Sequence, residues 1–252
     1  MTNCYVKNHV AAGSVWLVYL LLSLWLALIV AWKASAALGY GYPFWYERLA
    51  IGDHISQYAP QHPYKPGFSQ LPAEQHHQAF AQIAAAVHRG GAGLEQIAYA
   101  GPAGVDVTLL DKDEVGHLQD VAALMKGLER ATLVALPAWL LAGLLVISQG
   151  VPSVAARMVS LMALGLSVAL PLLVWGPKAV FYSLHEWIFP PGHPWFFYWN
   201  ESLMSTLMKA PYLFGGIASM IGVMALPLWW LIYRSGITLA GRIRARGLRG
   251  RN

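Results

Sequence analysis

Four stretches of apolar residues that contain no charged side chain divide the chain. They cover Ser14–Trp32, Ala131–Ala156, Met158–Pro177 and Ala210–Tyr233. A helix needs about 20 apolar residues to cross roughly 30 Å of hydrocarbon, and each stretch provides about that length. The pattern therefore predicts an all-α polytopic membrane protein with four transmembrane helices.

The long segment between the first two stretches has helical periodicity with polar faces. Between Glu74 and His88, apolar residues recur every three or four positions, which predicts an amphipathic helix. A second helix is predicted to begin near Asp111, which can cap free backbone amides while Glu114 reciprocates from three positions later. An apolar stripe then continues from Val115 into the second stretch. The segment is therefore predicted to be a small, mainly helical domain.

Aromatic residues dominate the segment between the third and fourth stretches. Trp175–Phe189 is predicted to continue the third span, and a Pro-Pro-Gly sequence is expected to end it. His193–Trp199 is too aromatic for a solvated loop, and aromatic side chains concentrate at membrane surfaces. Tyr40–Tyr46, directly after the first stretch, is expected at the interface for the same reason. Asn200 or Ser202 is expected to cap a short helix.

Charged residues are sorted between the segments that join the stretches. All twelve acidic residues fall within Glu47–Glu129 or at Glu186 and Glu201. Lys and Arg close to span ends are retained in the cytoplasm, so a cluster of arginines after the fourth stretch predicts cytoplasmic termini. The segments after the first and third stretches are then extracytoplasmic. The clustered arginines are Arg234, Arg242, Arg244, Arg246, Arg249 and Arg251.

These observations predict an alternation of cytoplasmic, membrane and extracytoplasmic segments. The cytoplasmic segments are the N-terminus 1–13, the turn 150–157 and the basic tail 234–252. The transmembrane helices are 14–37, 131–149, 158–180 and 210–233. The extracytoplasmic segments are the domain 38–130 and the interfacial loop 181–209.

Composition limits the class of protein further. The 252 residues are 57% hydrophobic, which fits one membrane unit with a modest outside domain. The excess positive charge lies in the tail, where attraction to anionic lipid explains it, so no nucleic-acid partner is expected. Cys4 is the only cysteine, so the outside domain has no disulfide framework. The first span is predicted to remain as an anchor, with cleavage at Ala34-Ser35-Ala36 as the alternative.

Two histidines stand out by position. His117 lies on the helix predicted to begin near Asp111, with Asp113 and Asp120 one turn away on the same face. A neighbouring carboxylate can orient an imidazole and select its tautomer. His185 lies near the outer end of the third span, where a polar side chain is expected to face a cavity or the bundle interior. The positions predict a two-histidine site, with purely structural or interfacial histidines as the alternative.

The remaining histidines leave another possibility open. His76, His77 and His88 are close in sequence, and a metal site formed by them is an alternative hypothesis to the two-histidine site. Their spacing matches neither HExxH nor paired CxxC, so no metal and no cofactor is predicted. A GxSxG elbow and a Gly-rich phosphate loop are absent from the sequence.

Two motifs resemble those of a known family. Residues 109–121, around His117, read LLDKDEVGHLQDV and resemble E-x-x-H-[LM]-x-D-V. Residues 181–204, around His185, read FYSLHEWIFPPGHPWFFYWNESLM and resemble H-x-[IL]-F-F-P-x-G-x-W-x-F…S-L-I. With four spans in this order, the chain is similar to the bacterial integral membrane family that includes lipoprotein intramolecular transacylase.

This resemblance implies an acyl transfer at the outer face of the bacterial cytoplasmic membrane. The family's characterised activity moves an acyl chain from the sn-2 ester of a lipoprotein's diacylglyceryl-cysteine to that cysteine's α-amino group, giving a lyso-form lipoprotein. The implied partners are this lipoprotein and membrane lipid, and the family's functional histidines match His117 and His185. The supporting carboxylates would be Asp113, Glu114, Asp120 and Glu186. The substrate-contacting residues would be Trp187, Phe189, Trp195, Phe197 and Ser202.

The residues themselves are compatible with that chemistry. An α-amine has a pKa of about 7.7–8.0, so it needs only an imidazole base to become nucleophilic. The oxyanion formed by attack on the ester needs a hydrogen-bond donor, which a second imidazole can supply. His117 as base and His185 as donor is one assignment, and the reverse stays open. The rival functions are a non-catalytic module that binds a lipid or partner protein, and an extracytoplasmic metal-handling protein.

Overall fold

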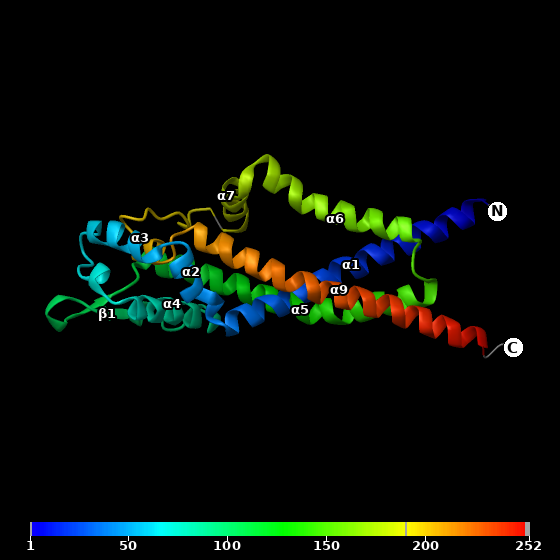
Figure 1. The fold of residues 1–252 in the computed structure, drawn as a ribbon, viewed down its shortest axis with the longest axis horizontal. Coiled ribbons are helices and arrows are strands. Elements are labelled where there is room, and N and C mark those ends of the chain that lie inside the picture. Colours follow the sequence, from blue (N-terminus) through cyan, green and yellow to red (C-terminus); the bar gives the residue numbers. More distant parts are fainter. Residues whose placement is uncertain (1, 190, 250–252) are drawn as a thin grey trace. The chain divides into compact units, whose positions relative to one another are not determined.

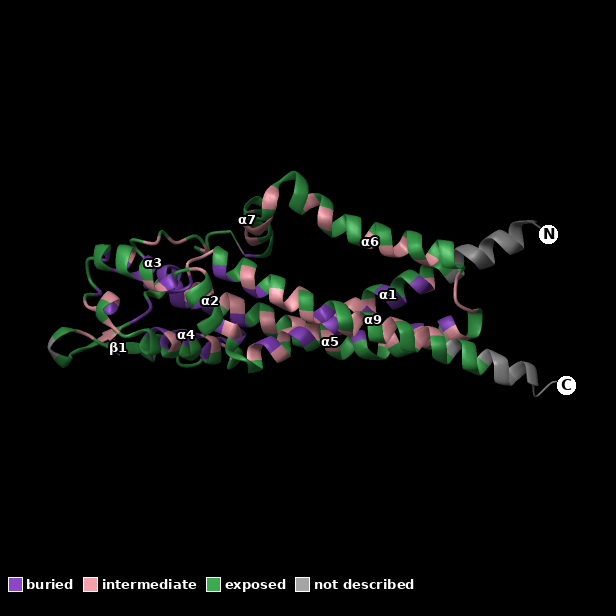
Figure 2. Ribbon diagram, in the orientation of Figure 1, coloured by how far each residue is buried: buried purple, intermediate pink, exposed green. Residues whose placement is uncertain are grey.

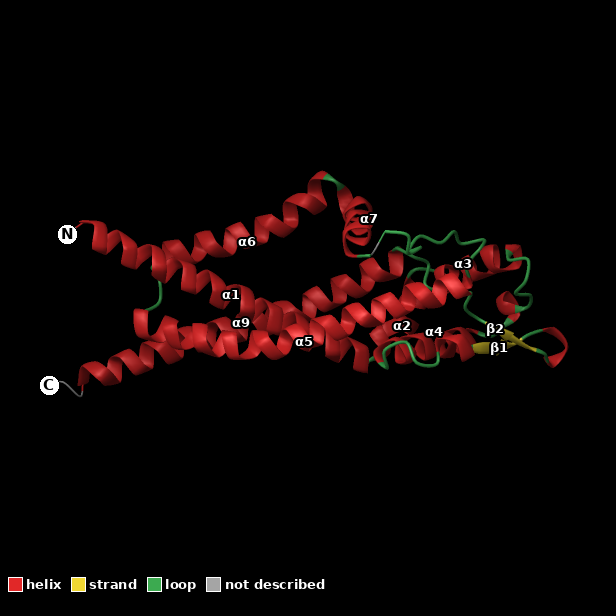
Figure 3. Ribbon diagram, turned by 180° about the vertical axis from the view of Figure 1, so that it is seen from behind, coloured by secondary structure: helices red, strands yellow, loops and turns green. Residues whose placement is uncertain are grey.

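The computed structural model describes residues 2–189 and 191–249, and Figure 1 labels their helices and strands. Predictions that fall on Met1, Pro190 and residues 250–252 lie outside these described residues. Within the described part, the chain is almost entirely helical (Figure 3).

Four long helices carry the apolar stretches, and each is long and apolar enough to cross a membrane. They are α1 (Thr2–Ala37), α5 (Lys112–Gln149), α6 (Val154–Val174) and α9 (Tyr212–Arg249). The predicted class, an all-α polytopic membrane protein, is confirmed. The chain divides into two compact units, which we call the membrane unit and the second unit. The membrane unit comprises Met1–Ala34, Glu129–Val174 and Ile221–Asn252, and the second unit comprises Ser35–Leu128 and Trp175–Met220.

Side chains of α1 form the centre of the membrane unit. Tyr19 and Leu20 are buried against residues of α5 and α9. Trp139 of α5 donates a hydrogen bond to the hydroxyl of Ser23 (2.9 Å), and Trp229 of α9 donates to the carbonyl of Leu20 (3.3 Å). In hydrocarbon, polar groups are stable when they are paired within or between helices. These contacts hold α1, α5 and α9 side by side (Figures 1 and 3).

The third span, α6, differs from the other three. None of its residues is buried, and Figure 2 shows no buried segment along its length. Its sequence is apolar on every face, with Arg157 as the only charged side chain. Leu161 packs against the core formed by α1 and α5, and most of the other side chains are apolar and exposed, as expected for a helix that faces lipid.

The second unit consists of short helices, turns and one small sheet. Its helices are α2 (Tyr42–Arg48), α3 (Ile51–Tyr58), α4 (Ala73–His88), α7 (Gly176–Ile188) and α8 (Leu203–Leu207), together with the first half of α5. Two strands, β1 (Ala98–Ala100) and β2 (Asp106–Thr108), pair antiparallel, a feature that the sequence did not predict. The predicted amphipathic helix is α4, and the predicted capped short helix is α8, with Ser202 as its cap.

Three tyrosines after the first span, Tyr40, Tyr42 and Tyr46, belong to the core of the second unit. The ring of Tyr42 is buried and stacks on Phe80 of α4, with 4.0 Å between ring centroids. Its hydroxyl donates a hydrogen bond to the carbonyl of Leu207 at 2.7 Å. The hydroxyl of Tyr46 hydrogen-bonds Nδ1 of His76 at 2.9 Å. These tyrosines join α2 to α4 and α8, and the position of the cluster at the membrane interface stays a prediction.

The helix after the third span is separate from it. The sequence predicted one continuous helix to Phe189, but α6 ends at Val174 and α7 begins at Gly176. Gly176 has φ +80°, a left-handed conformation that glycine adopts without strain and that an α-helix lacks. Pro177 follows and has no amide hydrogen for a helical hydrogen bond. The Gly-Pro pair therefore accounts for the break.

Removal of the Tyr42 ring is expected to destabilise the second unit, because it leaves a cavity against Phe80 and α8. We expect Tyr42→Ala to lower the free energy of unfolding by about 3–5 kcal/mol. Tyr42→Phe keeps the stack and loses one buried hydrogen bond, so a loss of about 0.5–1.5 kcal/mol is expected. Tyr64, 84% exposed, provides the control, and Tyr64→Ala should change little. Unfolding in detergent measures all three, and equal losses for Tyr42→Ala and Tyr64→Ala would contradict the assignment.

Candidate functional site

Two elements distant in the chain bring His117 and His185 together in the second unit. His117 lies on the second turn of α5, and His185 lies close to the end of α7. The centroids of their rings are 6.4 Å apart, and the ring planes are inclined by 34°. A hydrogen bond from a ring nitrogen extends about 3 Å, so both imidazoles can reach the same small group.

The surroundings of His185 determine which ring nitrogen carries its proton. Nδ1 lies 2.8 Å from the carbonyl oxygen of Phe181, one turn earlier on α7. A carbonyl oxygen only accepts, so Nδ1 donates, and Nε2 of the neutral ring keeps its lone pair. Burial lowers the pKa of His185, and the hydrogen bond to Phe181 opposes this effect in part. Nε2 is therefore able to accept a proton at neutral pH.

His117 is enclosed by aromatic rings. Its centroid lies 4.8 Å from that of Phe189 and 5.8 Å from that of Phe197. Its Nδ1 is buried and has no hydrogen-bond partner among the residues that the structure describes. A neutral imidazole carries one proton, and a proton on Nε2 leaves only an acceptor unpaired at Nδ1.

The carboxylate of Asp120, one turn after His117, contacts another histidine. Its Oδ2 lies 2.6 Å from Nδ1 of His193, in the loop that follows α7. The sequence predicted Asp120 or Asp113 as the partner that orients His117. Asp113 is exposed on α5, and the structure pairs Asp120 with His193. This pair joins the first turns of α5 to the aromatic loop.

Aromatic side chains from α7 and the following loop enclose His185. Its ring centroid lies 3.9 Å from that of Phe181, 5.3 Å from that of Phe189 and 5.2 Å from that of Trp195. Phe189 contacts both histidines and is itself 8% exposed. The two imidazoles therefore lie in an apolar environment that strengthens hydrogen bonds made there and disfavours charge on the rings.

Only some of the other predicted site residues lie beside the histidine pair. Of the predicted substrate-contacting residues, Phe189, Trp195 and Phe197 surround the pair, whereas Trp187 is 83% exposed. Glu186 is exposed on α7. The two remaining residues, Glu114 and Ser202, are buried together in a separate polar network.

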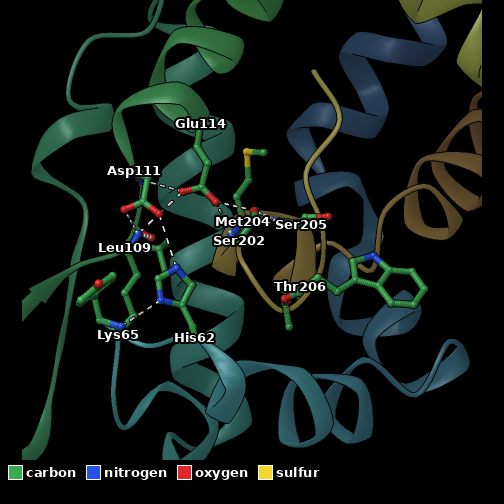
Figure 4. A network of polar contacts seen from close by, with 11 residues as sticks. His62, Lys65, Leu109, Asp111, Glu114, Ser202, Met204, Ser205 and Thr206 are labelled. Atoms are coloured by element: carbon green, nitrogen blue, oxygen red, sulfur yellow. Dashed lines mark hydrogen bonds and ion pairs between the residues drawn. The ribbon is translucent and has the colours of Figure 1, made fainter. Parts of the chain in front are cut away.

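Glu114 is the centre of that network, which Figure 4 shows from close by. Its side chain is buried, and Oε2 accepts a hydrogen bond from the backbone amide of Asp111 at 2.6 Å. This is the reciprocal half of the capping arrangement that the sequence predicted at the start of α5. Oε1 accepts from the hydroxyl of Ser202 and from the backbone amide of Met204 at 3.3 Å.

A buried lysine supplies the opposite charge. Nζ of Lys65 lies 2.8 Å from a carboxylate oxygen of Asp111, 3.8 Å from Glu114, and 2.7 Å from the carbonyl of Leu109. Nε2 of His62 lies 3.5 Å from Asp111. A buried charge is tolerated when it is paired and hydrogen-bonded, as here. The network therefore ties the loop after α3 and the start of α8 to the first turn of α5, three residues before His117.

Sequence reasoning missed several members of the site. Helical spacing places Phe181 one turn before His185 on α7. The hydrogen bond from His185 to the backbone carbonyl of Phe181 corresponds to no sequence motif, so it was not predicted. His193 and Lys65 lie in loops without periodicity, so no pattern connected them to α5. Their partners became evident only from the folded chain.

The loop and α4 histidines have other contacts. His76 hydrogen-bonds Tyr46 and the carbonyl of Phe68 (3.0 Å), and His88 hydrogen-bonds the hydroxyl of Tyr40 (2.7 Å). Among the described residues, no group of three or more His, Cys, Asp or Glu side chains is placed to hold a metal ion. In the described part of the chain, His76, His77 and His88 therefore do not form the metal site of the alternative hypothesis.

The spans and the enclosed imidazole pair define the chain as a polytopic membrane protein with a candidate acid–base site. Its structure neighbours include the membrane integral lipoprotein intramolecular transacylase Lit from Bacillus cereus. One solved structure of Lit, with a histidine replaced by arginine, is 15% identical, with a TM-score of 0.59 over 97% of this chain and 98% of that chain. Another, with a histidine replaced by alanine, is 16% identical, with a TM-score of 0.59 over 96% and 99% of the chains. The chain therefore has the fold of Lit along nearly its whole length.

Sequence comparison adds nothing to this likeness. No protein-family model matches the chain, and no curated protein matches it.

Loss of the Glu114 carboxylate is expected to destabilise the start of α5, because Lys65 would remain buried with less compensation. We expect Glu114→Ala to lower the free energy of unfolding by about 3–5 kcal/mol. Lys112 is exposed on the same helical turn, and Lys112→Ala should change it by no more than about 0.5 kcal/mol. Unfolding of both variants in detergent tests this. A Glu114→Ala protein as stable as Lys112→Ala would show that the network contributes little.

Proposed function

We propose that the protein is a membrane acyltransferase that acts on diacylglyceryl-modified lipoproteins. It would move an acyl chain from the sn-2 ester to the α-amine of the same lipidated cysteine and release a lyso-form lipoprotein. The observation that carries this proposal is the enclosed pair of imidazoles, His117 and His185, with 6.4 Å between ring centroids. The fold shared with a lipoprotein intramolecular transacylase supports the choice of substrate class.

The reaction exchanges an ester for an amide within one molecule. The amine nitrogen attacks the sn-2 carbonyl, the new C–N bond forms, and the bond from the carbonyl carbon to the glycerol oxygen breaks. The amine loses one proton and the glycerol oxygen gains one, so a single proton has to be carried across the site. An imidazole that accepts this proton and returns it satisfies the balance. Because both reacting groups belong to the same substrate, orientation alone provides much of the catalysis.

We assign the general base to His185. Its Nδ1 donates to the carbonyl of Phe181, which supports Nε2 as the free acceptor for the amine proton. We assign to His117 the role of a hydrogen-bond donor through Nε2, which would stabilise the oxyanion formed on the ester. This is the reverse of the assignment that placed the base at His117, and the pairing of Asp120 with His193 supports the reversal.

The aromatic enclosure fits an amphiphilic substrate. Phe189, Trp195 and Phe197 would contact the glyceryl and acyl groups and exclude water from the ester. We infer that the site faces the extracytoplasmic side of a bacterial cytoplasmic membrane. The arginine-rich tail and the acidic residues of Glu47–Glu129 support this orientation, with both termini in the cytoplasm.

Replacement of either histidine is expected to slow the transfer strongly without unfolding the protein. His117→Ala and His185→Ala should each lower the rate of lyso-lipoprotein formation by roughly 10²-fold or more, the typical contribution of general acid–base catalysis. If the two act as a unit, the double variant should be little worse than the poorer single variant. Mass spectrometry of lipoprotein N-termini measures the product. His88, exposed at the end of α4, is the matched control, and His88→Ala should retain near-normal activity.

The rate should depend on pH through two groups. As pH falls below about 7.7, the substrate amine becomes protonated and the rate drops about tenfold per pH unit. Burial lowers the pKa of His185 below its ordinary value of 6.5, so its lone pair is lost only at still lower pH, where the slope should steepen towards two. The residual activity of His185→Ala should keep the slope of one throughout. A wild-type profile without the steeper limb would count against His185 as the base.

A further inference from the structure

The membrane unit contains a cavity of about 250 Å³ beside the turn that joins α5 to α6. Its wall includes the apolar side chains of Ile147 from α5, Val151 from the turn and Ile237 from α9. Gly241 of α9 leaves the opposite side of the wall free of a side chain, and Arg157 of α6 lines the remainder. The cavity thus combines one cationic side chain with an apolar surface.

Arg157, which lines this cavity, has an unpaired donor. Its Nε is buried and has no hydrogen-bond partner among the described residues. An unpaired N–H of a charged group in a low-dielectric environment is strongly destabilising unless an external acceptor satisfies it. A guanidinium presents several donors in one plane, which match the oxygens of a phosphate group.

The membrane unit offers no acidic side chain to this arginine. Glu129 is its only acidic residue, and it forms an ion pair with Lys33. Glu129 is also 20 positions before Gln149 on α5, which corresponds to about 30 Å along the helix. No acidic side chain of the membrane unit therefore neutralises Arg157.

The start of α6 adds a second source of positive potential. Ser153 caps the helix by accepting a hydrogen bond from the amide of Ala156 at 3.3 Å, and Arg157 follows in the first turn. Free amides at a helix N-terminus favour a nearby anion. An anion beside Arg157 would thus meet both the guanidinium and the helix start.

We propose that this cavity binds one anionic phospholipid from the surrounding leaflet. Its phosphate diester would accept hydrogen bonds from Arg157, and an acyl chain would lie against Ile147, Val151 and Ile237. A phospholipid fits this site better than a free anion, because only the lipid also covers the apolar wall. The α5–α6 turn belongs to the predicted cytoplasmic side, so the lipid would come from the inner leaflet. This site is separate from the histidine pair and does not depend on the proposed acyl transfer.

Native mass spectrometry of the full chain in detergent tests the proposal with dioleoyl-phosphatidylglycerol as the probe. The wild-type protein should retain one bound lipid. Arg157→Gln should weaken this binding by roughly tenfold or more, because one charge-assisted interaction is worth about 1.5–3 kcal/mol. Arg157→Lys, which keeps the charge and loses the planar fork, should give an intermediate loss.

Arg234 provides the matched control, because it lies in the same unit with its guanidinium over the ring of Trp230 (5.7 Å). Arg234→Gln should bind the lipid within about twofold of wild type, and circular dichroism should confirm that all variants remain folded. Unchanged lipid binding by a folded Arg157→Gln protein would overturn the proposal. Equal retention of diolein, which lacks phosphate, would also overturn it. If an equal concentration of inorganic phosphate displaced the lipid, the site would be a site for a free anion, and the phospholipid proposal would be overturned.

Discussion

The carboxylate of Glu114 is buried, and segments far apart in the chain depend on it. The backbone amide of Asp111 donates to it at the start of α5, Ser202 and Met204 donate to it from the start of α8, and Lys65 supplies the opposite charge. A carboxylate can be buried only while such partners remain in place. The network therefore fixes where α5 begins, and it sets the position of the histidine that follows one turn later. Stability of the second unit and geometry of the candidate site thus share one origin.

The fold class was largely predictable because lipid imposes simple rules. Spans need length and apolar faces, and helix starts need acceptors, so the four spans and the capped start of α5 could be read from local pattern. Features set by tertiary contacts could not. Tyr42 has the composition of an interfacial residue, yet Phe80 and Leu207 bury it. The break at Gly176 depends on one backbone conformation, and a two-stranded sheet of three-residue strands is too short to leave a periodic signal.

The sequence predicted that His117 and His185 share one site, but not which side chains contact the neighbouring polar residues. His117 and His185 were identified from helical position and motif, and the folded chain brings them together. Helical spacing placed Asp120 on the same face as His117, but it does not reveal a loop that arrives from 73 residues away, and His193 takes that carboxylate. Likewise, Ser202 was expected to meet substrate, and it is buried on Glu114 instead. Local sequence patterns identify the side chains that can act as acids, bases or ligands, while long-range packing determines which of them are in contact.

The third span has no buried residue, and this affects how its sequence can change over time. Away from Leu161, which packs on the α1/α5 core, and Arg157, which lines the cavity, its exposed apolar side chains have no specific partner to fit, so leucine, valine, methionine or phenylalanine can replace one another there. Selection at these exposed positions of α6 therefore acts on the length and overall hydrophobicity of the helix, and the identity of individual residues can change. Two chains built in this way can share one architecture at 15% identity, as this chain and Lit do. The likeness therefore lies in the fold, where the two sequences have little in common.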